Sequence, residues 1–244
     1  MHLLARLTTC PLCTRRSSTV HGACAACLRR WHETSDRYVD TSGPWTRVWT
    51  RPYDDLARRT LHALKFGGAG ALAAPLGAVL YRALHANDVR VGAVTYVPLH
   101  RHRRWERGYD QARAIAAAVA HGYGVPLVTT LRRTRRTSRQ ARLGRHDRTE
   151  NVSGAFLSLV VPRAPIVLID DVVTTGATTD ACARTLMAGG ARSVVIATLA
   201  RADPPGCAGA RTTEARYERA SEHRDESRHH AHQGSREHLR VGVS

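Results

Sequence analysis

The chain has 244 residues, 43% of them hydrophobic and 5% aromatic, which suits one α/β domain with a small appendage. Its formal net charge is +17, from 37 basic and 20 acidic side chains, and residues 211–244 hold only seven of the former and six of the latter. The positive electrostatic field of residues 1–210 attracts polyphosphates or nucleic acid. The chain has only one lysine, so its many arginines also reflect a preference for arginine codons. No run of about 18 apolar residues occurs and the apolar N-terminal stretch is too short for a secretory signal, so we expect a cytoplasmic protein without membrane insertion.

Four of the six cysteines form two C-x2-C pairs, Cys10 with Cys13 and Cys24 with Cys27. Two such pairs bring four thiolates into the tetrahedron of a structural zinc site. Disulfides are the alternative, which an oxidising compartment favours, and His21 is a further candidate ligand. We therefore expect a zinc-ribbon-like module over residues 1–36, folded by its metal because so short a segment has no core of its own.

Two helices are predicted over residues 53–86, separated by the stretch FGGAG at 66–70. Lys65 stands at the end of the first helix, where a cation complements the helix dipole. A strand is predicted over residues 93–97. The next residues are expected to form a loop that directs four arginines into the crevice beyond the strand end, where they would receive a pyrophosphate: Arg101, Arg103, Arg104 and Arg107. A helix follows that buries Ala112, Ile115, Ala116 and Val119.

Residues 132–148 contain eight arginines and one acid without a helical or strand period, which indicates a mobile basic loop. Such a loop can close over a pyrophosphate or follow the backbone of a single-stranded nucleic acid. The main domain is expected to span residues 37–207. Residues 208–244 have no apolar period and many charged side chains, which predicts a disordered tail.

The stretch IVLIDDVVTTGATTD, residues 166–180, predicts the centre of a parallel sheet. Residues 166–169 form a short apolar run, typical of a strand that is buried on both faces. A helical stripe follows and ends at Gly189 and Gly190, and a second strand is predicted over residues 193–199. The segment is therefore a βαβ unit, and its polar turn is expected beyond the strand end, where ligands bind in such sheets.

Asp170, Asp171 and the following turn suit a sugar phosphate. The turn opens a helix, so free backbone N–H groups and the helix dipole favour an anion there. Gly176 lets the backbone curl around a phosphate, and hydroxyl donors come from Thr174, Thr175 and Thr178. The two carboxylates can accept hydrogen bonds from sugar hydroxyls or hold Mg²⁺. The alternative is that Asp170 is a helix-entry residue and the threonines are turn chemistry alone.

The same stretch resembles the phosphoribosyl-pyrophosphate (PRPP) motif of type I phosphoribosyltransferases. That resemblance implies that Asp170 and Asp171 meet the ribose 2′- and 3′-hydroxyls. It also implies that the 5′-phosphate is wrapped by Val173, Thr174, Thr175, Gly176, Ala177 and Thr178.

The order of five features along residues 10–203 resembles the ComF competence-protein family. These are the four cysteines, LKFGG, VPLHRHRRWERGYDQA, TSRQARLGRHDRTENVSGAF and VLIDDVVTTGAT. The resemblance implies an α/β fold of the type I phosphoribosyltransferase kind, a parallel sheet flanked by helices, with an N-terminal zinc module. It further implies a part in handling incoming DNA during natural transformation, with a helicase partner. The family usually has Phe-Asn where this chain has Tyr109 and Asp110.

Two functions from different classes follow. As a binding protein, the chain would hold PRPP or a related sugar phosphate and handle single-stranded DNA, which its positive charge and arginine loop favour. As an enzyme, it would transfer ribose 5-phosphate from PRPP to a nitrogenous base, using Mg²⁺ together with Arg101, Arg104 and Arg107 to stabilise the leaving pyrophosphate. Against the transferase hypothesis, residues 199–203 contain no aromatic side chain on which the base could stack.

Overall fold

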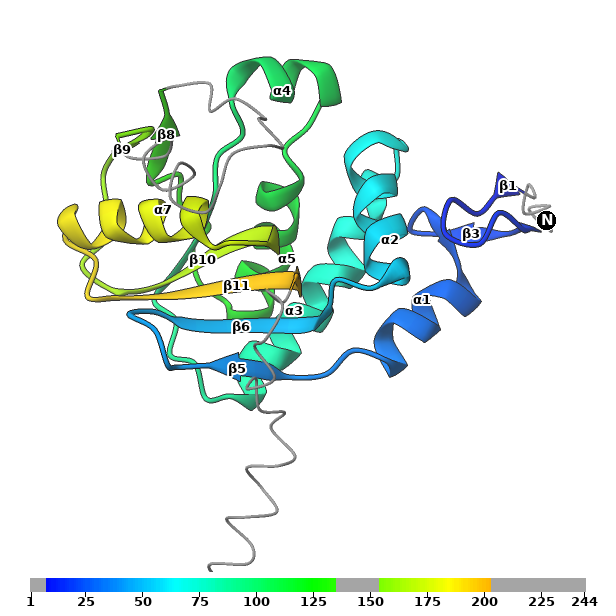
Figure 1. The fold of residues 1–244 in the computed structure, drawn as a ribbon, viewed down its shortest axis with the longest axis horizontal. Helices are drawn as coiled ribbons and strands as arrows, with labels where there is room; N and C mark the ends of the chain where they lie inside the picture. Colours follow the sequence, from blue (N-terminus) through cyan, green and yellow to red (C-terminus); the bar gives the residue numbers. More distant parts are fainter. Residues whose placement is uncertain (1–7, 135–153, 203–244) are drawn as a thin grey trace, which may run out of the picture.

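The computed structural model describes residues 8–134 and 154–202, which form a five-stranded sheet with helices on both faces (Figure 1). The strand order is β5-β6-β11-β10-β7. The strands are β5 (Tyr38–Asp40), β6 (Thr46–Pro52), β7 (Ala93–Tyr96), β10 (Pro165–Val173) and β11 (Ser193–Arg201). The four strands β6, β11, β10 and β7 are parallel, and β5 is an antiparallel edge strand. The predicted α/β class with a parallel sheet is confirmed.

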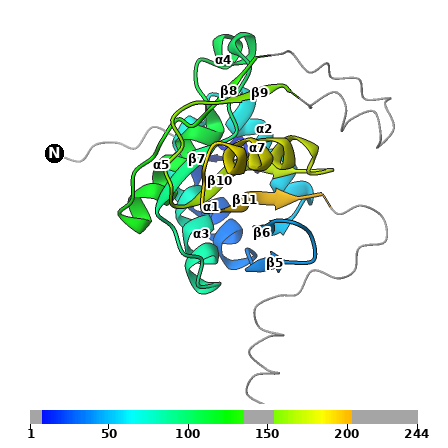
Figure 2. The same ribbon diagram turned by 90° about the vertical axis from the view of Figure 1, so that its left-hand side faces the viewer.

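The central strand β10 is buried on both faces, as its apolar run predicts. Val167 and Ile169 pack in the cluster that contains α3 (Ala73–Ala86) and α5 (Gln111–Tyr123). Ile166 and Leu168 pack on the opposite side, with α7 (Ala177–Ala188) and a hairpin. The hairpin consists of β8 (Leu131–Arg133) and β9 (Phe156–Ser158), and Figure 2 shows the sheet between the two layers. Side chains that alternate along β10 therefore contribute to two different hydrophobic cores, one on each face of the sheet.

Two helices occupy the segment for which two were predicted, namely α2 (Asp55–Phe66) and α3, with a short 3-10 turn η1 (Gly70–Leu72) between them. The Asp54 carboxylate caps α2 by accepting a hydrogen bond from the Ala57 N–H at 2.8 Å. Asp110 caps α5 in the same way through the Arg113 N–H at 3.2 Å. Both caps satisfy N–H groups that a helix start leaves without a partner.

Three local predictions are wrong. Strand β10 does not end before Asp170 but runs through Val173, because β11 continues beside it in register, with Asp170 opposite Thr198 and Val172 opposite Ala200. The arginine loop after β7 is a helix, α4 (Arg101–Arg107), which ends at Gly108 with φ +72°. Residues 132–133 of the expected basic loop belong to strand β8, while its residues 135–148 lie outside the described part of the chain.

The N-terminal module consists of two small hairpins and one helix. They are β1 (Thr8–Thr9) with β2 (Arg16–Ser17), β3 (Thr19–Val20) with β4 (Ala23–Cys24), and α1 (Ala25–Glu33). Leu12 and Trp31 are buried in the same cluster as Leu61 of α2 and Leu76 of α3. The module therefore has no core of its own, as expected, but shares the core of the main domain.

No helix in residues 8–134 and 154–202 is long and apolar enough to cross a lipid bilayer. The tail predicted to be disordered, residues 208–244, lies outside the described residues, and the boundaries at residues 36 and 207 stay predictions.

Candidate functional site

Asp171 is a buried carboxylate with two partners that sequence reasoning missed. Its side chain is 5% exposed, and its Oδ2 lies 2.7 Å from Nζ of Lys65 at the end of α2. The same oxygen accepts a hydrogen bond from Nε2 of Gln111, the first residue of α5, at 3.4 Å. An ammonium and an amide thus stabilise the ionised carboxylate in a place where burial alone would disfavour it.

Asp170 has a raised pKa. Consecutive side chains of a strand point to opposite faces, and Asp170 lies on the side of Cys182 of α7, because burial first and then the Asp170 charge raise the pKa of the Cys182 thiol. Burial, followed by the negative charge of Asp171, raises the pKa of Asp170 to about 8. The site thus favours the neutral form of Asp170, and in that form it can donate a hydrogen bond.

The turn after β10, which was predicted to hold an anion, begins α7 at a left-handed glycine. Gly176 precedes α7 with φ +83°, a left-handed conformation that glycine adopts without strain. Thr174 and Thr175 are exposed, while Val173 is buried and the side chains of Ala177 and Thr178 are partly buried. The hydroxyls of Thr174 and Thr175 and the first N–H groups of α7 thus lie at one end of the strand that carries the acid pair.

An acid in the first turn of α7 is neutralised by a residue that sequence reasoning also missed. Asp180 has an oxygen 2.7 Å from Nη2 of Arg47 on β6, and both side chains are mostly buried. Without this ion pair, Asp180 would compete with a bound anion for the positive end of the helix dipole.

The four arginines expected to receive a pyrophosphate all lie on α4, which follows β7, the neighbour of β10 in the sheet. Arg104 is exposed, and the Arg107 guanidinium stacks over the Phe66 ring at 4.9 Å. Of Arg101 the structure describes the backbone only. The Tyr109 hydroxyl donates a hydrogen bond to the Leu64 carbonyl, which ties the segment after α4 to the end of α2 that carries Lys65.

The four cysteine sulfurs gather as the spacing predicts. Cys10, Cys13, Cys24 and Cys27 are free thiols whose Sγ atoms all lie within 4.8 Å of one another. Sγ of Cys13 and Cys24 are 3.8 Å apart, and a tetrahedron with Zn–S bonds of about 2.3 Å needs S–S separations of about 3.8 Å. The cluster can hold a metal ion, and its dimensions fit structural zinc.

The environment of the cluster favours the thiolate at Cys10, whereas burial, followed by hydrogen bonds with Cys24 and Cys13, raises the pKa of Cys27. The Cys24 N–H donates to Sγ of Cys10 at 3.4 Å. Burial opposes the ionisation of Cys10, but backbone hydrogen bonds, led by that from Cys24, lower the pKa of Cys10 to about 7. His21 is exposed in a turn, with φ +51°, and does not belong to this cluster of thiols.

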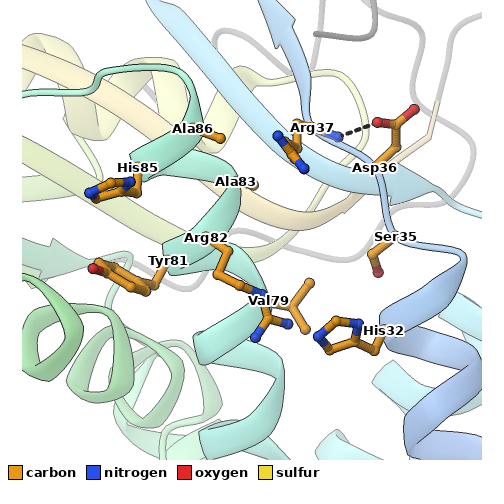
Figure 3. Close-up of a pocket in the computed structure, with 10 residues that line it drawn as sticks. All are labelled: His32, Ser35, Asp36, Arg37, Val79, Tyr81, Arg82, Ala83, His85 and Ala86. Carbon is orange, nitrogen blue, oxygen red and sulfur yellow. Dashed lines mark hydrogen bonds between the residues drawn. The ribbon is translucent and has the colours of Figure 1, made fainter. Parts of the chain in front are cut away.

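A hollow of about 370 Å³ lies apart from both sites, between α1 and α3 (Figure 3). His32, Arg37 and Arg82 line it together with Asp36, whose carboxylate accepts a hydrogen bond from the Arg37 N–H. A second hollow of about 420 Å³ shares His32 and Val79 with it. Neither hollow is lined by a residue of the acid pair or of the threonine-rich turn.

Known proteins that are similar to this chain in sequence have names that refer to DNA utilization and competence. No protein-family model matches the chain. The chain is 30% identical over 204 residues to the DNA utilization protein YhgH of Salmonella typhimurium. This match covers 80% of this chain and 85% of that protein. The Escherichia coli K12 protein of the same name is 30% identical over 202 residues, 80% and 84% of the two chains. Competence protein F of Haemophilus influenzae is 34% identical over 116 residues, 45% and 50% of the two chains.

A parallel α/β sheet that carries an acid pair before a threonine-rich turn defines a phosphoribosyltransferase-like protein. The chain belongs to the ComF family of such proteins. Among solved structures, it resembles TT1426 from Thermus thermophilus, with 18% identity, a TM-score of 0.35, and coverage of 56% of this chain and 86% of that one. It also resembles orotate phosphoribosyltransferase from Aeropyrum pernix, with 20% identity, a TM-score of 0.35, and coverage of 72% and 80%.

One signal in the sequence could have identified Lys65. It is the single lysine among 37 basic residues, so an ammonium stands here in a chain that uses arginine everywhere else. An ammonium is a compact point charge with three donors, which suits a partly covered place beside one carboxylate oxygen better than a broad guanidinium does. Gln111 and Arg47 carried no such signal, because their roles depend on contacts between distant segments.

Proposed function

We propose that this protein binds PRPP or a related ribose 5-phosphate at the turn between β10 and α7, and that it handles single-stranded DNA during DNA uptake. The observation that carries the first part is Gly176, with φ +83°, opening α7 directly after the strand that bears Asp170 and Asp171. The second part is supported by relatives whose names refer to DNA utilization and competence, and by the formal net charge of +17.

The arrangement suggests a division of work between the two acids. The 5′-phosphate would accept hydrogen bonds from the first N–H groups of α7 and from Thr174, Thr175 and Thr178. Asp171, paired with Lys65, would accept from one ribose hydroxyl. Asp170, whose raised pKa favours the neutral form, can in that form both donate to and accept from the other hydroxyl. This arrangement explains why two adjacent carboxyls are placed beside an anion.

The Lys65 ammonium makes Mg²⁺ binding at Asp171 unfavourable. A cation already lies 2.7 Å from Asp171, and a second cation on the same oxygen would be repelled. We infer that the acid pair serves the ribose hydroxyls and that Mg²⁺, where it takes part, comes with the pyrophosphate of the ligand. Arg104 and Arg107 of α4, and Arg101 by its place in the chain, are the candidates to meet that pyrophosphate.

Zinc is proposed as the metal of the cysteine cluster. Four thiols whose sulfurs lie within 4.8 Å of one another can supply all four ligands of a tetrahedron and leave no open position, which is the arrangement of structural rather than catalytic sites. Its role would be to fix the fold of the module, which buries Leu12 and Trp31 against the main domain.

The test is isothermal titration of the full chain with PRPP in the presence of Mg²⁺. The wild-type protein should bind, and Asp170→Asn with Asp171→Asn should lose measurable affinity while the circular dichroism spectrum is kept. Asp88→Asn, which removes one exposed carboxylate in the turn after α3, is the control and should bind as the wild type does. Equal affinity of the double variant and the wild type would show that the pair is a structural feature only.

The same samples separate binding from transfer. Incubation with PRPP and a nitrogenous base should release no pyrophosphate if the protein is a binding module. Release that the double variant lacks would make it a phosphoribosyltransferase, the alternative function that the fold allows.

A further inference from the structure

Trp105 is the most exposed large aromatic side chain in the described part of the structure. It lies on α4 and is 85% exposed, whereas Trp31 and Trp49 are 2% exposed. Leaving an indole in water forgoes the free energy of burying a large apolar surface. In both views α4 stands at the outer end of the molecule, away from the sheet core (Figures 1 and 2). An indole held there on a helix is available to a ligand.

The surroundings of Trp105 are basic. Its helix carries Arg103, Arg104 and Arg107, and its one acid, Glu106, lies 3.1 Å from His102. The positive charge of this helix extends to Arg133 of the neighbouring hairpin. Burial, and then the positive charge of Arg103, lower the pKa of the Arg133 guanidinium. An anion placed between α4 and the hairpin would relieve this repulsion.

A second exposed aromatic ring adjoins the same helix. Phe66, at the end of α2, is 57% exposed, and the Arg107 guanidinium lies over its ring at 4.9 Å. Aromatic rings and guanidinium groups therefore occur together on this face. Sequence reasoning looked for an aromatic platform near residues 199–203, and the structure offers one on α4 instead.

This combination suits one class of partner. A protein interface has an apolar core from which charged residues are depleted, whereas Trp105 has charged neighbours on both sides in the chain, Arg104 and Glu106. Single-stranded nucleic acid offers flat bases to stack on a ring and phosphates to meet arginines. A duplex would present the phosphates alone, because its bases are already stacked.

We propose that α4 is a contact surface for single-stranded DNA, with Trp105 as the stacking platform and Arg103, Arg104 and Arg107 as the phosphate contacts. This inference rests on the DNA-handling part of the proposed function. Trp105 and Arg103 have no part in the proposed sugar-phosphate site, whereas Arg104 and Arg107 would serve both ligands, so Trp105 is the residue that tests this inference separately.

Fluorescence anisotropy of a labelled 15-nucleotide thymidine oligomer, titrated with the full chain, measures the affinity. Trp105→Ala should weaken binding by about 5- to 150-fold, the range for the loss of one base-aromatic stack. Trp105→Phe keeps a ring and should stay within about threefold of the wild type. Val160→Ala, which alters an 89% exposed apolar residue without a ring, is the matched control and should leave the affinity unchanged.

A second oligomer separates stacking from charge. An abasic strand of the same length has the phosphates without the bases, so Trp105→Ala should change its affinity by less than about twofold. Intrinsic tryptophan fluorescence gives the location: Trp31 and Trp49 are buried and Trp45 is partly buried, so the fluorescence quenching by the thymidine oligomer should come mainly from Trp105. That quenching should be lost in Trp105→Phe although the oligomer still binds.

The outcomes distinguish the two proposals. If the wild type does not bind the thymidine oligomer, the DNA part of the proposed function is wrong and this inference with it. If it binds but Trp105→Ala has the same affinity, the DNA lies elsewhere and only this inference is overturned. If Trp105→Ala loses PRPP affinity as well, Trp105 belongs to the sugar-phosphate site, which also contradicts the assignment.

Discussion

Lys65 and Asp171 form an ion pair of 2.7 Å that joins the end of α2 to the strand of the candidate site. The Asp171 side chain is 5% exposed and that of Lys65 21% exposed, so water screens the pair little. The Tyr109 hydroxyl holds the same end of α2 through the Leu64 carbonyl. The position of α2 therefore determines the electrostatic state of the acid pair.

Removal of the Lys65 charge should destabilise the fold. Lys65→Met keeps the length of the side chain but leaves a buried carboxylate without its cation, which costs about 3 kcal/mol. The free energy of unfolding from urea titrations at neutral pH measures the loss. Lys65→Met combined with Asp171→Asn should be less destabilised than the sum of the two single changes, because no unpaired charge remains. Strict additivity would mean that the two residues do not interact in solution.

Asp170 should make stability depend on pH in an unusual direction. Its pKa is about 8 in the folded chain and about 3.9 when unfolded. Between these values the folded state holds a proton that the unfolded state has lost, so the free energy of unfolding falls as the pH rises, by at most about 1.4 kcal/mol per pH unit. Urea titrations from about pH 5 to pH 9 should show Asp170→Asn gaining stability relative to the wild type up to about pH 8, and no further above it. Parallel curves would contradict the raised pKa.

Substitution of Gly176 should weaken ligand binding as well as strain the backbone. A side chain at φ +83° costs about 1 to 2 kcal/mol, and any shift of the turn moves the N–H groups that would hold the phosphate. Gly176→Ala should therefore lower both the melting temperature and the affinity for PRPP. Gly68→Ala is the control, since Gly68 has φ +64° with open space around it. It should show the same strain with unchanged PRPP affinity.

Metal removal should affect the whole chain and not only the N-terminal module. We expect elemental analysis to find about one zinc per chain on Cys10, Cys13, Cys24 and Cys27. Because Leu12 and Trp31 share a core with α2 and α3, chelation should lower the melting temperature of the single unfolding transition. A metal-free protein with two disulfides, or a chelated protein with an unchanged melting temperature, would contradict the structural role.

The position of the acid pair also changes how it should be tested. From the sequence, both acids were expected beyond the strand end, where alanine substitutions would spare the fold. The structure places both within β10, with Asp171 buried against Lys65 and Gln111. Asparagine substitutions keep the shape and the hydrogen bonding capacity in that strand, so they separate ligand binding from folding better than alanine does.

Features of this protein that follow from local pattern could be predicted from its sequence. The apolar run at residues 166–169, the helical stripe after Gly176 and the paired C-x2-C spacing predicted a central strand, a helix and a cysteine cluster, and the structure has all three. Periodicity and ligand spacing act over a few residues and can be recognised along the chain. The tertiary structure alone decided that Lys65 pairs with Asp171, that the arginines after β7 lie on a helix with an exposed Trp105, and that the module shares the main core. These features depend on which distant segments meet and on what each side chain contacts, and no local pattern records that.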